Sequence, residues 1–150
     1  MSFTVLALCG SLRSSSSNAG LIRMAQRVAP AGLTIDHYTG LGSLPFYNAD
    51  LDVPGSEPAS VVDYRNRVVA ADAVLIATPE YNWSLPAVMK NAFDWSSRPL
   101  TGAPLAKKVV AVVCSGGGGG ASKARAYLSE MLGLFGNTVI AREMRFAISA

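Results

Sequence analysis

Residues 3–18 read FTVLALCGSLRSSSSN, an apolar run that ends in a glycine and a serine-rich polar turn. Residues 21–28 then repeat apolar side chains at helical spacing, and Pro30 ends that helix. An apolar run without polar alternation is typical of a strand that is covered on both faces, as in a parallel sheet. This strand–turn–helix unit therefore predicts the beginning of an α/β domain.

The same unit recurs along the chain. A polar turn containing Gly or Pro follows each strong apolar run, with Ser84 as the expected N-cap of the middle helix and Gly136 closing the last. The remaining expected elements are strands at 33–38, 73–77, 109–113 and 138–148, and helices at 59–70, 85–93 and 124–135. Alternation of this kind predicts a parallel sheet with right-handed crossovers and helices on both faces.

Composition limits the class of protein. A chain of 150 residues suits a single domain, 1–150, and the content of 50% hydrophobic and 15% charged residues excludes a disordered chain. No apolar run reaches the roughly 18 residues of a membrane span, and the N-terminus lacks a signal-peptide pattern. Cys9 and Cys114 are too few for a disulfide framework, so we expect a reducing, cytoplasmic location.

The net charge of +3 is unevenly placed. Residues 1–35 contain Arg13, Arg23 and Arg27 and no acidic residue. Basic residues are not clustered with aromatic ones, which argues against nucleic-acid binding. The uneven charge instead predicts a local anion site near the N-terminus.

Ligands of open α/β sheets bind beyond the carboxyl ends of the strands, where three unusual loops are expected. The first, residues 10–18, opens a helix, whose N–H groups and dipole favour a phosphate, with Arg13 adding a charge-assisted contact. It is not a Walker A loop, because no Gly-Lys-Ser/Thr follows. The alternative is a serine-rich turn with Ser17 or Asn18 as the N-cap.

The second loop, residues 78–84 (TPEYNWS), could stack a planar ligand, or it could be a tight turn whose aromatic residues cover the core. The helix after it offers further residues. Lys90 and Asp94, four apart, favour a surface ion pair. Candidates for the site or for an interface are Asn91, Asp94, Trp95 and Arg98.

The third loop is Ser115 followed by five glycines, residues 116–120. It meets the dinucleotide pattern Gly-x-Gly-x-x-Ala only trivially, so a plain surface loop is the alternative. His37 is the single histidine, which argues against a catalytic triad or a multi-histidine metal site. No catalytic side chain and no metal site is predicted, so we expect a bound cofactor to carry the chemistry.

Residues 10–18, 78–86 (TPEYNWSLP) and 90–99 (KNAFDWSSRP) together resemble the signatures of the NADPH-dependent FMN reductase family. That family includes quinone, azo-dye and chromate reductases. The resemblance implies a flavodoxin-like, doubly wound, five-stranded parallel sheet of order 2-1-3-4-5. It also implies FMN as cofactor, NADPH or NADH as reductant, and a homodimer or homotetramer.

The resemblance assigns FMN contacts to all three loops. Ser11, Arg13, Ser16, Ser17 and Asn18 would hold the phosphate; Pro79, Glu80, Tyr81 and Asn82 would line the isoalloxazine; Ser115, Gly116 and Gly118 would border the ring.

The chain departs from the family pattern in four places, the first being Ser14 and Ser15 in place of a more varied pair. Trp83 replaces a smaller aromatic residue, and residues 120–123 read Gly-Ala-Ser-Lys where the family has Gly-Gly-x-Arg. A helix usually follows the last strand, whereas this chain ends at Ala150. We therefore expect either a truncated chain or a sheet face that another subunit covers.

The resulting hypothesis is ping-pong hydride transfer from NAD(P)H through FMN to a small-molecule acceptor: a quinone, an azo compound, free flavin or a metal oxyanion. No nucleic-acid or membrane partner is expected. Three alternatives stay open: a flavodoxin-type electron carrier, a nicotinamide-dependent dehydrogenase that uses residues 116–120, and a truncated domain without activity. The positive net charge argues against the carrier.

Overall fold

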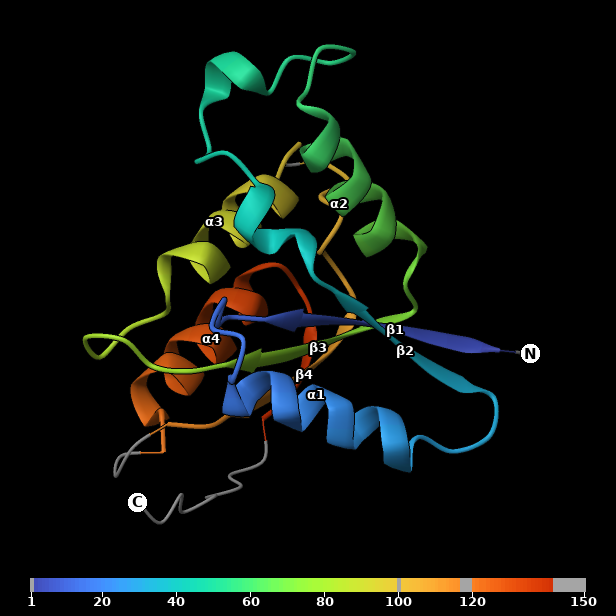
Figure 1. Ribbon diagram of the computed structural model, residues 1–150. Helices are drawn as coiled ribbons and strands as arrows, with labels where there is room; N and C mark the ends of the chain where they lie inside the picture. Colours follow the sequence, from blue (N-terminus) through green and yellow to red (C-terminus); the bar gives the residue numbers. More distant parts are fainter. Residues whose placement is uncertain (1, 100, 117–119, 142–150) are drawn as a thin grey trace.

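The computed structural model describes residues 2–99, 101–116 and 120–141. Strands and helices alternate as predicted (Figure 1). The strands are β1 (Phe3–Cys9), β2 (Leu33–Tyr38), β3 (Ala73–Thr78), β4 (Val109–Cys114) and β5 (Thr138–Ile140). The helices are α1 (Ser17–Val28), α2 (Ala59–Ala70), α3 (Ala87–Ser96) and α4 (Ser122–Leu134), with short 3-10 helices η1 (Gly40–Ser43) and η2 (Ala49–Leu51) between β2 and α2.

The five strands form one parallel sheet in the order β2-β1-β3-β4-β5. This order confirms the predicted doubly wound, flavodoxin-like topology. Since the order reverses between β1 and β3, the loops after these two strands leave the sheet side by side.

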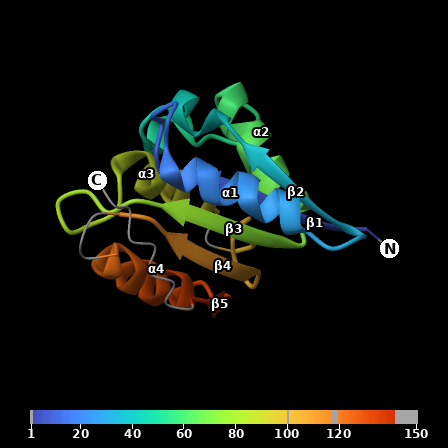
Figure 2. The ribbon, with the colours of Figure 1, turned by 60° about the horizontal axis from the view of Figure 1, so that its bottom comes forward.

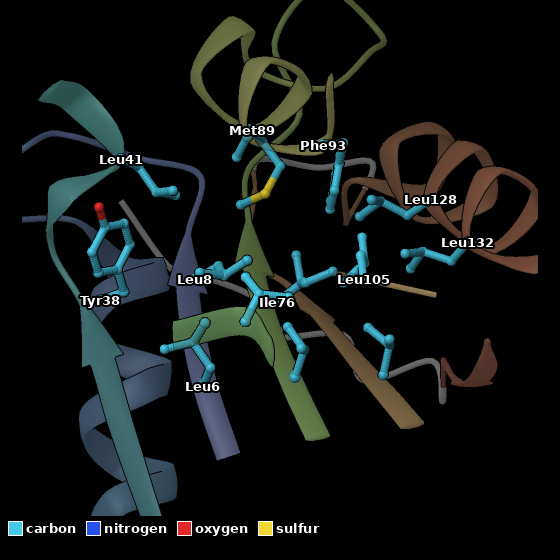
Figure 3. Packing of buried hydrophobic residues seen from close by; sticks show 14 of the residues in the cluster. Leu6, Leu8, Tyr38, Leu41, Ile76, Met89, Phe93, Leu105, Leu128 and Leu132 are labelled. Atoms are coloured by element: carbon cyan, nitrogen blue, oxygen red, sulfur yellow. The ribbon is translucent and has the colours of Figure 1, made fainter. Parts of the chain in front are cut away.

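Helices cover both faces of the sheet, and α1 lies on the opposite side from the pair α2 and α3 (Figure 1). On the α1 face, Ile22 is fully buried against a small cluster formed by Ala7, Cys9, Leu75 and Ala77. The other face carries the larger core, in which Met89 and Phe93 of α3 meet Leu128 and Leu132 of α4 over the leucine and isoleucine side chains of the strands (Figure 3). Helix α4 runs beside β4 and β5 (Figure 2).

Two predicted helix starts were wrong by a residue or more. The N-cap of α1 is Ser16, not Ser17 or Asn18, because its hydroxyl accepts a hydrogen bond from the Ala19 amide at 3.3 Å. The N-cap of α3 is Pro86, since Ser84 is bound into the preceding turn. The described part of the last strand ends at Ile140, and residues 142–148 of that prediction lie outside the described residues.

Helix α3 owes its unusual sequence largely to packing. Asn91 accepts a hydrogen bond from the Tyr47 amide and donates to the Pro45 carbonyl, at 2.8 and 2.9 Å. The Trp95 indole, fully buried, donates to the same carbonyl at 2.7 Å. These two residues fasten the segment after η1 to the core. The predicted Lys90–Asp94 ion pair is present on the surface.

Within the ranges that the structure describes, no helix combines the length and apolar character that crossing a membrane requires.

Candidate functional site

The carboxyl ends of β1 and β3 approach each other at Gly10. Its amide donates to the Ala77 carbonyl at 2.8 Å. A Cβ atom at Gly10 would lie 2.1 Å from the Thr78 hydroxyl oxygen and 2.8 Å from the Thr78 Cβ, and Thr78 is fully buried. Only glycine permits this approach, which brings the first and second loops together. Gly10 was not predicted on its own as a point of close approach, although a glycine directly after a buried strand would have indicated it.

One cavity of about 300 Å³ lies between the three loops. Such a volume is at the lower end of the range for small-molecule sites. All but two of the predicted site residues line it: Ser11, Arg13, Ser16, Ser17, Asn18, Pro79, Glu80, Tyr81, Ser115 and Gly116. Asn82 is not among the lining residues, and Gly118 lies outside the described residues. The fold thus gathers residues that are far apart in sequence into one site.

Asn18 joins the first loop to the third. Its side-chain amide donates to the Ser115 carbonyl at 3.0 Å, and its side-chain oxygen accepts from the Ser115 amide at 2.9 Å. Asn18 and Ser115 are both almost fully buried. The Ser115 hydroxyl also donates to the Ser17 hydroxyl at 3.2 Å. Asn18 therefore holds the end of β4 against the start of α1, a role that the local sequence did not reveal.

The second loop ends in a tight turn. Tyr81 and Ser84 exchange two backbone hydrogen bonds of 3.0 Å. Asn82 and Trp83 lie at the tip with φ of 50° and 59°, the signs that a type I′ turn requires. The aromatic rings do not cover the core, because Tyr81 is 52% and Trp83 72% exposed. The exposed rings therefore contradict the alternative in which this loop covers the core.

Glu80 joins the second loop to the start of α4. Its carboxylate accepts hydrogen bonds from the Lys123 and Ala124 amides at 2.9 and 3.0 Å. The adjoining Ala121 has φ of 55° and supplies no capping side chain. The Lys123 ammonium also lies 6.0 Å from the centre of the Trp83 ring. A distant carboxylate thus takes the place of a local N-cap.

Two titratable groups flank the cavity. Burial raises the pKa of the Cys114 thiol to about 11, with Arg125 lowering the pKa and Glu80 raising it. Burial also lowers the pKa of His37, and Arg23 lowers it further. His37 lines a neighbouring cavity of about 180 Å³ that shares Ser11 and Arg13 with the first. Among the described residues, no group of three or more potential His, Cys, Asp or Glu ligands could hold a metal ion.

The model of the NADPH-dependent FMN reductase family matches residues 3–150. The chain belongs to this family. An NAD(P)H:quinone oxidoreductase of Solanum tuberosum is 38% identical over 149 residues, which cover 97% of this chain and 75% of that protein. An NAD(P)H-dependent FMN reductase of Pseudomonas aeruginosa is 40% identical over 129 residues, covering 85% and 68%.

Solved structures agree with this family assignment. The flavoenzyme FerB, an NAD(P)H:(acceptor) oxidoreductase from Paracoccus denitrificans, superposes with a TM-score of 0.82 at 37% identity, covering 97% of this chain and 78% of that one. An azoreductase from Bacillus anthracis shares the fold, with a TM-score of 0.67 at 23% identity and coverage of 93% and 86%. The chain is therefore an NAD(P)H-dependent oxidoreductase of the FMN type.

The donor set of this FMN reductase suits a flavin phosphate. Ser11, Ser16, Ser17 and Arg13 line the cavity together with the start of α1, and they can offer hydroxyl, guanidinium and backbone N–H donors to a phosphate. Glu80 is the single acidic residue among the lining residues, and the α4 amides already engage its carboxylate. The anion end of the cavity thus keeps its positive character, so the residues that are present fit FMN.

Proposed function

We propose that this FMN reductase reduces a quinone at the expense of NAD(P)H, using FMN held between its three loops in a single domain of residues 1–150. When bound, FMN supplies the hydride-accepting and electron-donating chemistry that no side chain here provides. The main support for this function is that all but two of the predicted site residues line one cavity. The relatives named as quinone oxidoreductases support the choice of a quinone over an azo compound, free flavin or a metal oxyanion.

The residues divide the work along the cavity. Arg13 and the serine hydroxyls at the start of α1 neutralise and position the phosphate. Pro79, Glu80 and Tyr81 line the part of the cavity assigned to the isoalloxazine. The protein positions the reactants and supplies electrostatic stabilisation. How well ordered its three loops are therefore controls the reaction rate more than any proton-donating side chain does.

Anaerobic addition of NADPH to the FMN-loaded protein tests this function. We expect the visible flavin absorption to bleach rapidly and to return when a quinone is added. Slow bleaching with NADPH, together with fast bleaching by a separate reductase, would instead identify an electron carrier. A parallel titration with NADH measures which nicotinamide cofactor is preferred.

Arg13 provides a direct test of the phosphate site. Arg13→Ala removes a charge-assisted contact, and we expect the FMN Kd, measured by fluorescence quenching, to rise about tenfold. Arg27→Ala is the matched control, because Arg27 is exposed in the last turn of α1, away from the cavity. Equal FMN affinities in the two variants would remove Arg13 from the site.

We further propose that the protein works in a reducing cytoplasm as a homodimer or homotetramer, without nucleic-acid or membrane partners. Cys9 and Cys114 are buried free thiols, which suits a reducing compartment. The exposed rings of Tyr81 and Trp83 beside the cavity are candidates for a subunit contact. Analytical ultracentrifugation of the wild type and of Trp83→Ser tests the assembly; an unchanged oligomer in the variant would exclude Trp83 from the interface.

A further inference from the structure

We propose that Glu80 is a positioning residue that couples FMN binding to the start of α4. In this proposal, which rests on the proposed function, the side chain of Glu80 binds the start of the helix while the residue also lines the cavity. A ligand that orders Glu80 therefore stabilises the hydrogen bonds of its carboxylate to α4, and those hydrogen bonds in turn keep the residue ordered for the ligand.

Two hydrogen bonds attach Glu80 to the start of α4. Its carboxylate accepts from the Lys123 and Ala124 amides at 2.9 and 3.0 Å, while the residue as a whole lines the cavity. Ala124 is fully buried in the main core, so the start of α4 is a firm anchor. The backbone at Glu80 is held by an attachment 43 residues away.

Glu80 lies between the buried residues Thr78 and Pro79 and an exposed turn. Thr78 is fully buried, and after Pro79 the chain leads into the exposed turn at 81–84. The Lys123 ammonium also lies near the Trp83 ring, which is 72% exposed. Without its carboxylate, this segment would lose two hydrogen bonds to the start of α4.

The charge of Glu80 explains why the coupling favours the ligand. The partial positive charge of the α4 N-terminus compensates the carboxylate, so the carboxylate is directed to the helix and not to the anion end of the cavity. A ligand that orders residues 79–81 therefore strengthens the cap. By thermodynamic reciprocity, a formed cap strengthens the binding of that ligand.

Three variants and one exchange experiment test this coupling. Glu80→Ala removes the acceptor, Glu80→Gln keeps an acceptor oxygen without the charge, and Glu130→Ala removes the same charge from an exposed position later in α4. We expect Glu80→Ala to raise the FMN Kd up to about tenfold, Glu80→Gln to recover part of it, and Glu130→Ala to leave it unchanged. The visible absorption and circular dichroism of bound FMN should shift in Glu80→Ala only.

Amide hydrogen exchange on the wild type keeps the test independent of variant folding. We expect FMN to increase protection of the Lys123 and Ala124 amides, and this increase to vanish in Glu80→Ala. Wild-type protection that FMN does not change would overturn the coupling, as would a Glu80→Ala variant with reduced Tm but wild-type FMN affinity and spectrum. If FMN protects both amides but NADPH fails to bleach the flavin, the proposed function falls and the coupling stands.

Discussion

Helices α1 and α4 both begin at the carboxyl edge of the sheet, yet their first turns are capped differently. Ser16 caps α1 from within the same turn, three residues from the amide that it binds. Glu80 caps α4 from a loop 43 residues away. The hydroxyl at α1 is neutral, whereas the carboxylate at α4 carries a full negative charge.

This difference shows how the molecule can direct an anion to one helix and away from another. A serine cap satisfies one amide and leaves the dipole of α1 uncompensated, so a phosphate is still attracted there. A carboxylate cap already fills the corresponding place at α4. The choice of capping residue, more than the presence of a helix end, thus distinguishes the two starts.

The largest effect is expected from a substitution that separates the first loop from the second. Gly10→Ala places a Cβ 2.1 Å from the buried Thr78 hydroxyl oxygen, so β1 and β3 must part at the edge where the first and second loops leave the sheet. We expect a loss of about 3 kcal/mol in the free energy of unfolding and loss of FMN binding. Urea denaturation and fluorescence quenching measure the two effects.

Gly133→Ala is the control for Gly10, because nothing lies within 4 Å of a Cβ there and the residue lies in the last turn of α4. It should stabilise the protein by about 0.5 to 1 kcal/mol. A Gly10→Ala variant as stable as the wild type would show that the strand ends tolerate separation.

The next largest effect is expected from removing the hydrogen bonds that join the first loop to the third. Asn18→Ala deletes both hydrogen bonds to Ser115 and leaves buried backbone groups without partners. We expect a loss of about 2 to 3 kcal/mol in the free energy of unfolding and a higher FMN Kd. Urea denaturation and an FMN titration measure these; a loss below about 0.5 kcal/mol would mean that water replaces the amide fully.

A smaller effect is expected from removing the N-cap of α1. Ser16→Ala removes the local cap, and we expect a loss of about 1 kcal/mol in the free energy of unfolding. Ser15→Ala, in the same loop but exposed, is the matched control and should change little. Equal denaturation midpoints for the two variants would contradict the assignment of Ser16 as the cap.

The smallest effect concerns pH. Burial and Arg23 lower the pKa of His37 from its usual 6.5, so the unfolded chain binds the extra proton more readily than the folded one. The free energy of unfolding should therefore fall as the pH drops below about 6.5, and level off below the lowered pKa. Urea midpoints between neutral and mildly acidic pH should show this slope in the wild type and lose it in His37→Asn. A variant with the same slope would assign the effect to other groups.

Much of the fold could be predicted because its signals are local. The apolar runs around Leu8, Ile76 and Val112 do not alternate with polar residues, as expected of strands in a parallel sheet. Burial on both faces is complete in β3, whereas β4 leaves Val109 exposed and Ala111 and Val113 half-buried. Gly136, with φ of 70°, follows the end of α4 as expected of a helix-closing glycine. The start of α3 was misplaced because Ser84, a good capping residue, is used by the turn at 81–84 instead.

The candidate site was predictable only in part. Loop position pointed to the three loops, since all parallel strands place their carboxyl ends at one edge, and the family resemblance supplied the individual residues. They were not enough to say where a side chain points. Asn18 and Glu80 were assigned to the ligand, yet their side chains form hydrogen bonds with Ser115 and with the start of α4.

The sequence thus accounts for the strands, the order of helices and the serine-rich start of α1, because each depends on neighbours within a few residues. The close contact of Gly10 with Thr78, the bond from Asn18 to Ser115 and the cap from Glu80 to α4 depend on partners 43 to 97 residues away. Those partners meet only after the parallel sheet has aligned its strand ends. Hydrogen bonds and steric contacts act over a few ångströms, so no local pattern could have assigned them.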